Sequence, residues 1–288
     1  MTGFRRLKSF CFAAIPLLAL SCGPSQQRGG DANAISIKGS DTMLHLATGW
    51  ADAFMKAHPE KKVSVTGGGS GTGVAALLNG TTDICASSRD LKEEEKKQAA
   101  GKGLTLHEHA VARDAIALVV NTANPISELT LEQIRKIYTG EVLAWSQVGG
   151  PEEKVVAISR ESSSGTYLFF MEHVLDKKDF RTDALLLPAT SAIIESVIES
   201  PWAIGYVGLG YAVEAAGKVK ILGVKPATDQ PAVIPSAESV RNGQYSIARP
   251  LYLFTEGDET GSVKEFVDFC ASPEGLAIIA ETGYITVQ

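Results

Sequence analysis

A strand, a glycine and a hydroxyl-rich helix start follow one another at residues 35–42, which read Ile35-Ser36-Ile37-Lys38-Gly39-Ser40-Asp41-Thr42. The apolar side chains that follow have a period of 3.6 residues, which predicts a helix; they are Met43, Leu46, Ala47, Trp50 and Phe54. Further β-branched runs predict strands at 62–66, 82–86, 115–120, 155–159, 204–207, 219–224 and 250–254. Strands that alternate with amphipathic helices in this way predict an α/β fold.

The same local chemistry opens three more of the predicted helices. These segments are Gly67-Gly68-Gly69-Ser70-Gly71-Thr72-Gly73, Ser87-Ser88-Arg89-Asp90 and Arg160-Glu161-Ser162-Ser163-Ser164-Gly165-Thr166. A helix N-terminus presents free N–H groups, Ser and Thr hydroxyls add donors, and Arg89 and Arg160 add positive charge. Any one segment is explained by ordinary helix capping. Because ligands in α/β sheets bind at the carboxyl ends of strands, the four together predict a cage for a small oxyanion.

Composition narrows the class of protein. The 288 residues include 27 Lys and Arg against 33 Asp and Glu, for a formal charge of −6. This length suffices for a large core and two domains, and the acidic balance argues against a nucleic-acid partner. The four cysteines form no CxxC pair, so we expect neither a zinc site nor a disulfide framework. We also expect no cofactor and no bound metal. Whether Cys85 and Cys270 pair is left open.

Residues 1–22 have the pattern of a lipoprotein signal peptide. Arg5, Arg6 and Lys8 precede an uncharged run at 10–20, which is shorter than the roughly 20 residues of a spanning helix. The run ends in Ala19-Leu20-Ser21-Cys22, which resembles a bacterial lipobox whose cysteine becomes lipidated. The polar residues 23–34 are expected to form a flexible tether. We therefore expect an exported protein, in the periplasm or at the cell surface, anchored to the membrane through Cys22.

Two places in the sequence suggest that the chain crosses between domains. Asn121-Thr122-Ala123-Asn124-Pro125 interrupts the chain after a predicted strand, and a strand resumes near Arg249 after the polar segment 236–246. The expected division is one lobe of residues 35–120 plus 250–288 and a second lobe of residues 121–249.

From about Ile35 to the C-terminus the sequence resembles the phosphate-binding component of bacterial ABC transporters, a type 2 periplasmic binding protein family. Besides the four helix starts, the resemblance rests on Asp83-Ile84-Cys85-Ala86 and on Ile137-Tyr138-Thr139-Gly140-Glu141 with Trp145-Ser146-Gln147-Val148-Gly149-Gly150. It implies two α/β lobes with mixed β-sheets flanked by helices, joined by a two-stranded hinge, with the ligand cleft between the lobes. It also implies an extracytoplasmic, non-catalytic protein that captures inorganic phosphate and delivers it to an inner-membrane ABC permease.

The resemblance carries the phosphate contacts to named positions in all four helix starts. They are Ser40, Thr42, Ser70, Thr72, Ser88, Arg89, Arg160, Ser163, Ser164, Gly165 and Thr166. Asp41 and Gly71, which lie within the same segments, are also expected to belong to the phosphate site.

The sequence departs from the family at the residue that accepts the proton of hydrogen phosphate. Well-known members have an aspartate about where Ser88 stands, and many have an acid where this chain has Ser162. An acceptor matters because sulfate has no proton to donate to a buried carboxylate. Asp41 and Glu161 are the remaining candidates, and Asp41 is favoured, although a role as helix N-cap would explain it equally well.

Other functions remain as alternatives. A different tetrahedral oxyanion, sulfate or molybdate, would fit the same cage. A phosphoryl or ester hydrolase would use Ser70 or Ser164 as nucleophile, but no histidine lies in the four segments. His107, Glu108 and His109 are interpreted as solvated strand residues in preference to metal ligands. We expect a monomer that binds phosphate, a permease and, through its lipid anchor, the membrane.

Overall fold

The computed structural model describes residues 32–257 and 260–287. Its strands are β1 (Ala34–Gly39), β2 (Lys62–Thr66), β3 (Ile84–Ser87), β4 (Leu106–Asn121), β5 (Glu128–Thr130), β6 (Val156–Arg160), β7 (Leu185–Leu187), β8 (Ala203–Gly208), β9 (Val219–Ile221), β10 (Gly223–Lys225) and β11 (Ala248–Glu256). Its helices are α1 (Leu44–Ala57), α2 (Ser70–Leu78), α3 (Glu93–Gly101), α4 (Leu131–Thr139), α5 (Gly165–His173), α6 (Thr190–Glu199), α7 (Leu209–Glu214), α8 (Ala237–Arg241), α9 (Gly261–Cys270) and α10 (Pro273–Glu281), with 3-10 turns η1 (Asp41–Met43) and η2 (Trp145–Val148).

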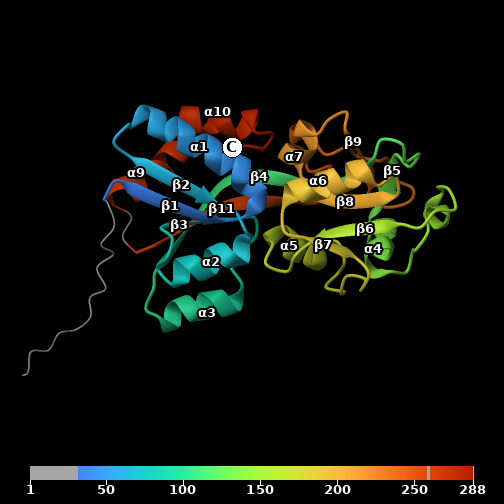
Figure 1. Cartoon of the computed structure of the whole chain (residues 1–288), viewed down its shortest axis with the longest axis horizontal. Coiled ribbons are helices and arrows are strands. Elements are labelled where there is room, and N and C mark those ends of the chain that lie inside the picture. The colour runs from blue at the N-terminus through green and yellow to red at the C-terminus, as the bar shows by residue number, and fades with distance from the viewer. Residues whose placement is uncertain (1–31, 258–259, 288) are drawn as a thin grey trace, which may run out of the picture. The chain divides into compact units, whose positions relative to one another are not determined.

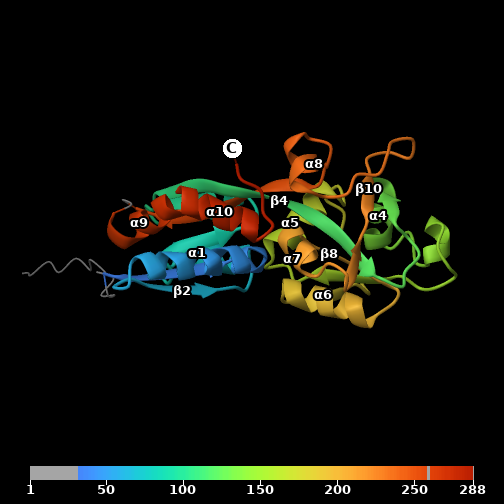
Figure 2. The same ribbon diagram turned by 90° about the horizontal axis from the view of Figure 1, so that it is seen from above.

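Within the described residues, one mixed sheet has the strand order β2-β1-β3-β11-β4-β8-β6-β7, and β9 pairs with β4. The long strand β4 runs through the middle of this arrangement (Figures 1 and 2). It pairs with β11 up to Ala115 and with β8 from Ile116 onward. The first half-sheet, as the term is used here, consists of β2, β1, β3, β11 and the part of β4 up to Ala115. The second half-sheet consists of the rest of β4 with β8, β6, β7 and β9.

Helices cover both faces of the first half-sheet. On one face, α1, α9 and α10 bury Trp50, Phe54, Phe266 and Ile279 against the strands, and the rings of Phe54 and Phe266 meet edge to face at 5.3 Å. On the other face, α2 and α3 pack a smaller cluster that includes Phe254. This double covering explains why β3 is buried on both faces, with Ile84 and Ala86 in the first cluster and Cys85 in the second.

The second half-sheet is also covered on both faces. Ile193 and Val197 of α6 pack with α7 on one face, while Tyr138 of α4 and Phe170 of α5 pack on the other. Helix α4 begins with a capping box, in which Thr130 Oγ1 accepts from the Gln133 N–H and Gln133 Oε1 accepts from the Thr130 N–H.

Two predicted strands have different bounds from those expected. The strand predicted at 115–120 is the second part of β4, which begins at Leu106 and includes the polar residues 107–109. The single strand predicted at 219–224 is wrong: β9 pairs with β4, whereas β10 pairs with β5 in a separate two-stranded sheet. The buried Leu222 lies between them, where the chain changes sheets.

Cys85 of β3 and Cys270 at the end of α9 are both free, buried thiols, and burial raises the pKa of each thiol above its usual value. The predicted signal peptide, its Cys22 and most of the tether lie outside the described residues; Ala34, assigned to the tether, belongs to β1. No helix in the described part of the chain combines the length and the apolar content needed to cross a membrane.

Candidate functional site

The four predicted helix starts meet at one place, where β1, β2, β3 and β6 end. The Ser40 hydroxyl donates to Ser88 Oγ at 2.8 Å, and the Ser88 N–H donates to Ser70 Oγ at 3.0 Å. Thr42 and Thr166 share a hydroxyl–hydroxyl bond of 2.7 Å. All five side chains are buried. The geometry therefore gathers hydroxyls from segments that are up to 126 residues apart, Ser40 to Thr166, into a single cluster.

The N-terminus of α5 closes this hydroxyl cluster. Ser164 is its N-cap and accepts from the N–H groups of Thr166 and Tyr167 at 3.1 and 3.3 Å. Gly165 lies so close to the first half-sheet that a Cβ there would be 2.7 Å from Ser88 Oγ and closer still to Ser70 Oγ. A side chain at this position would displace both hydroxyls.

The loop before α5 also contacts the glycine-rich loop before α2. The Gly71 N–H donates to the Ser163 carbonyl oxygen at 3.0 Å, and the Ser163 hydroxyl donates to the Gly68 carbonyl oxygen at 3.4 Å. The Thr72 hydroxyl donates to the Gly69 carbonyl oxygen at 2.7 Å, within its own turn. These residues lie at the border of the hydroxyl cluster and join its two sides.

Arg160 and Asp41 meet across the two half-sheets. The Arg160 guanidinium is almost completely buried and donates to Thr190 Oγ1 at 2.7 Å and to the carbonyl oxygens of Leu187 and Pro188. Its Nη1 lies 3.5 Å from Asp41 Oδ2, which also accepts from the Thr190 N–H at 2.6 Å. Asp41 therefore places a carboxylate from the first half-sheet at the N-terminus of α6, where negative charge is favourable.

Arg89 is also paired. Its guanidinium makes a two-pronged ion pair with Glu95 of α3, at 2.8 and 2.6 Å, and donates to the Asp90 carbonyl oxygen at 2.7 Å. The guanidinium is also close to the glycine-rich loop, because a Cβ added to Gly71 would lie 3.8 Å from Arg89 Nη2. Arg89 is thus beside the hydroxyl cluster, with its charge balanced by α3.

A third ion pair near the hydroxyl cluster involves two residues that the sequence did not point to as site residues. Arg249 of β11 lies directly opposite Asp114 of β4, with Nη2 3.0 Å from Asp114 Oδ2, and both side chains are buried. Arg249 also donates to Thr166 Oγ1 at 3.0 Å and to the Ser88 carbonyl oxygen at 2.9 Å. Burial raises the pKa of Asp114 and lowers that of Arg249, while each charge opposes the shift of its partner. The sequence did contain a signal for this pair: Asp114 directly precedes the predicted strand 115–120, and Arg249 directly precedes the predicted strand 250–254.

Three arginines therefore surround the cluster, and each has a carboxylate partner: Arg160 with Asp41, Arg89 with Glu95 and Arg249 with Asp114. With these charges balanced, an oxyanion would be held chiefly by hydroxyls and by the N–H groups of helix N-termini.

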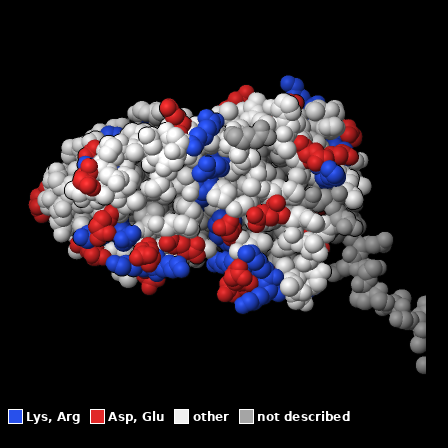
Figure 3. All heavy atoms as spheres, turned by 180° about the vertical axis from the view of Figure 1, so that it is seen from behind, with Lys and Arg blue, Asp and Glu red and all other residues white. Residues whose placement is uncertain are grey.

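On the face of the molecule seen in Figure 3, Lys and Arg are interspersed with Asp and Glu.

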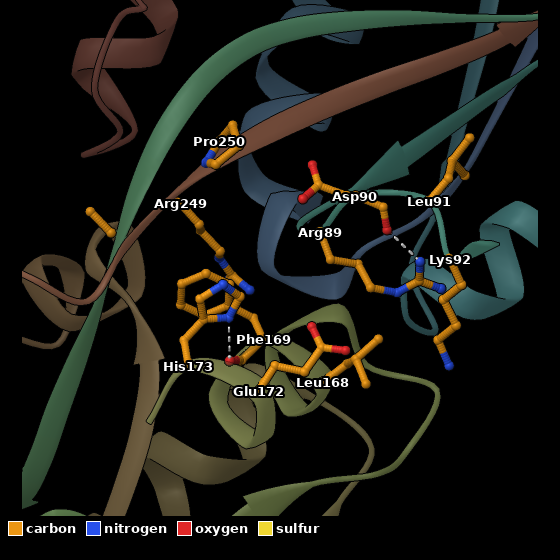
Figure 4. A pocket seen from close by; sticks show the side chains of 11 residues that line it. Arg89, Asp90, Leu91, Lys92, Leu168, Phe169, Glu172, His173, Arg249 and Pro250 are labelled. Atoms are coloured by element: carbon orange, nitrogen blue, oxygen red, sulfur yellow. Dashed lines mark hydrogen bonds between the residues drawn. The ribbon is translucent and has the colours of Figure 1, made fainter. Parts of the chain in front are cut away.

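Beside this cluster lies a cavity of about 240 Å³. Figure 4 shows its walls: the loop at Arg89, the helix α5 with Phe169 and His173, and β11 at Arg249. The Arg249 guanidinium lies over the Phe169 ring, 5.5 Å from its centre.

The contacts of the two candidate nucleophiles bear on the hydrolase alternative. Ser70 Oγ interacts with the N–H and hydroxyl of Ser88, and Ser164 Oγ accepts from backbone N–H groups. Near the cluster, His173 stacks on Phe169 and its Nδ1 meets the Phe169 carbonyl oxygen. Among the described residues, no group of three or more His, Cys, Asp or Glu side chains is arranged to hold a metal ion.

The mixed sheet, with helix N-termini meeting at its middle, defines a protein of the type 2 periplasmic-binding-protein class. Residues 25–274 match the model of the PBP superfamily domain. The phosphate-binding protein PstS of Staphylococcus epidermidis is 32% identical over 275 residues, which cover 92% of this chain and 83% of that protein. PstS of Borreliella burgdorferi is 33% identical over 263 residues, covering 88% and 90% of the two chains.

A solved structure agrees with these sequence comparisons. A substrate-binding protein assigned to a phosphate ABC transporter of Clostridium perfringens, with bound phosphate, superposes with a TM-score of 0.80 and 32% identity over 89% of this chain and 100% of that one. The chain belongs to the PBP superfamily and, within it, to the family of the PstS phosphate-binding proteins.

Proposed function

We propose that this protein binds inorganic phosphate at the hydroxyl cluster and delivers it to an ABC permease for import, without catalysing a reaction. The observation that carries the proposal is the meeting of Ser40, Ser70, Ser88 and Thr166 at the N-terminus of α5. The four helix starts thus supply hydroxyl and N–H donors around one point, which is the requirement for a small oxyanion. The names of the relatives and the phosphate in the Clostridium structure support phosphate as that oxyanion.

The proposed lobes follow from the pairing of the central strands. The sequence placed the crossings at Asn121 and near Arg249. In the structure β4 changes partner between Ala115 and Ile116, and β11 begins at Ala248 opposite Ala115. We therefore place the hinge in β4 and β11 at these positions, with lobe I before residue 116 and after residue 248, and lobe II between them.

The location and assembly of the protein are part of the same proposal. Proteins of this transport class work outside the cytoplasmic membrane, and the predicted signal at 1–22 supports export, with Cys22 as the lipid anchor. A single chain supplies all the proposed contact residues, which supports a monomer.

The direct test is a calorimetric titration of the domain from residue 32 onward with phosphate, sulfate and molybdate at neutral pH. We expect tight one-to-one binding of phosphate and much weaker binding of the other two anions. Preference for sulfate or molybdate would reject phosphate as the ligand and leave only the oxyanion site. Sustained turnover of phosphate esters, lost in Ser70→Ala or Ser164→Ala, would instead support the hydrolase.

Asp41→Asn should weaken binding of phosphate and sulfate by a similar factor, about tenfold, the order expected for one charge-assisted hydrogen bond. Asp41 Oδ2 contacts Thr190 and Arg160 of lobe II, so the carboxylate contributes by joining the lobes around any oxyanion. The measurement is the phosphate-to-sulfate affinity ratio. A fall in this ratio would show instead that Asp41 accepts the phosphate proton, the role favoured from the sequence.

A further inference from the structure

Arg249 and Asp114 form an ion pair inside the proposed hinge. They lie opposite each other on β11 and β4, next to the point where β4 changes partner. Arg249 Nε and Nη2 both contact Asp114 Oδ2, at 3.3 and 3.0 Å, and Asp114 Oδ1 accepts from the Leu209 N–H at 3.0 Å. Arg249 is 1% exposed and Asp114 is 0% exposed. A buried pair of this kind adds little net stability, so its position calls for a reason other than stability.

The remaining contacts of Arg249 reach both lobes. Nη1 donates to the carbonyl oxygen of Ser88, which follows β3 in lobe I. Nη2 donates to the hydroxyl of Thr166, which lies in the first turn of α5 in lobe II. The guanidinium also makes a cation–π contact with Phe169 of α5, with its central carbon 5.5 Å from the ring centre (Figure 4). One side chain on the hinge thus contacts two of the four segments of the hydroxyl cluster.

The bond to Thr166 sets the direction of that hydroxyl. A threonine hydroxyl has one proton to donate and two lone pairs that accept. Because a guanidinium can only donate, Thr166 Oγ1 is the acceptor in this bond, and its own proton must point elsewhere. Thr42 Oγ1, 2.7 Å away within the hydroxyl cluster, is an available acceptor for that proton. An oxyanion needs donors, so a hydroxyl held in this way is directed to serve it.

We propose that Arg249, held by Asp114, is a positioning residue of the phosphate site that orients the Thr166 hydroxyl as a donor and fixes the Ser88 backbone. The inference rests on the proposed function. It predicts that the ion pair matters for ligand affinity more than for folding, and that its effect passes largely through Thr166.

The test measures phosphate affinity by calorimetry and unfolding by thermal melting. The double variant Arg249→Gln/Asp114→Asn removes both charges, so that neither is left buried without a partner. We expect it to fold and to bind phosphate about 100-fold more weakly, as for loss of bonds from a charged donor. In the Thr166→Val background the same double substitution should cost only about tenfold, because interacting residues are not additive. Wild-type affinity of the folded double variant, or equal factors in the two backgrounds, would overturn the proposal.

Two further variants keep the test decisive. Arg249→Lys retains the charge beside Asp114 but cannot make the same set of hydrogen bonds, and we expect it to bind phosphate about tenfold more weakly. If the double variant does not fold, unchanged phosphate affinity of Arg249→Lys would overturn the proposal. Arg181→Gln/Asp183→Asn is the matched control, because Arg181 is also buried and paired but contacts α4; it should leave the affinity unchanged. Absence of phosphate binding in the unmodified protein would reject the proposed function itself, a result separate from either outcome for Arg249.

Discussion

Gly165→Ala should reduce phosphate affinity by at least about 100-fold while the protein remains folded. The added Cβ would lie 2.7 Å from Ser88 Oγ, closer still to Ser70 Oγ and 3.0 Å from Ser70 Cβ. Overpacking of this kind costs about 1–3 kcal/mol, and here it also displaces two proposed ligand donors. Because Gly165 belongs to lobe II and the two serines to lobe I, the clash arises only when the lobes close.

Calorimetry gives the affinity, and small-angle scattering with and without phosphate reports closure. The wild-type protein should become more compact with phosphate, and Gly165→Ala should not. Gly101→Ala is the matched control, since Gly101 ends α3 with no atom within 4 Å of its added Cβ. Compaction of Gly165→Ala equal to that of the wild type would show that α5 does not approach the serines as described.

Arg160→Ala should weaken phosphate binding by about 2–5 kcal/mol, the range for truncating one partner of a buried charge pair. The guanidinium holds Thr190 and the carbonyl oxygens of Leu187 and Pro188 in place, and it balances the charge of Asp41. Without it, Asp41 would remain in the closed cleft as a carboxylate without a cationic partner, next to an anion.

The measurement is again the dissociation constant for phosphate. Arg135→Ala serves as control, because Arg135 of α4 is also in lobe II but bonds to Glu132 and to the Val174 carbonyl oxygen; its affinity should equal that of the wild type. An unchanged dissociation constant for Arg160→Ala would remove Arg160 from the site.

The local features of this protein could be predicted from its sequence. The strand before Ser40, the capping box at Thr130 and the starts of α2 and α5 depend on residues that are close together in the chain. The predicted α/β fold class is confirmed. It could be predicted because it follows from the alternation of these local elements.

The partners of charged groups could not be predicted, because they depend on which distant segments meet. Asp41 and Arg160 are 119 residues apart in the sequence, and Asp114 and Arg249 are 135 apart. From the sequence, Arg160 and Arg89 were expected to bring positive charge to an anion, and the structure shows that each is paired with a carboxylate. Residues 107–109 were expected to be strand residues and 115–120 a strand, but that both belong to the single long strand β4 was not predicted, because it depends on the pairing with β11.

The position of β11 has a consequence for how the chain matures during synthesis. β11 lies between β3 and β4, and α9 and α10 after it supply Phe266 and Ile279 to the core around Trp50. The ribosome makes this segment after the other strands of both lobes, so lobe I lacks the strand that joins β3 to β4 until residues beyond 248 have emerged. Lobe II is continuous in sequence and has all its strands earlier. A nascent chain ending before β11 would therefore expose the apolar edge of β3, and we expect C-terminal truncations to be recognised by chaperones as unfinished protein.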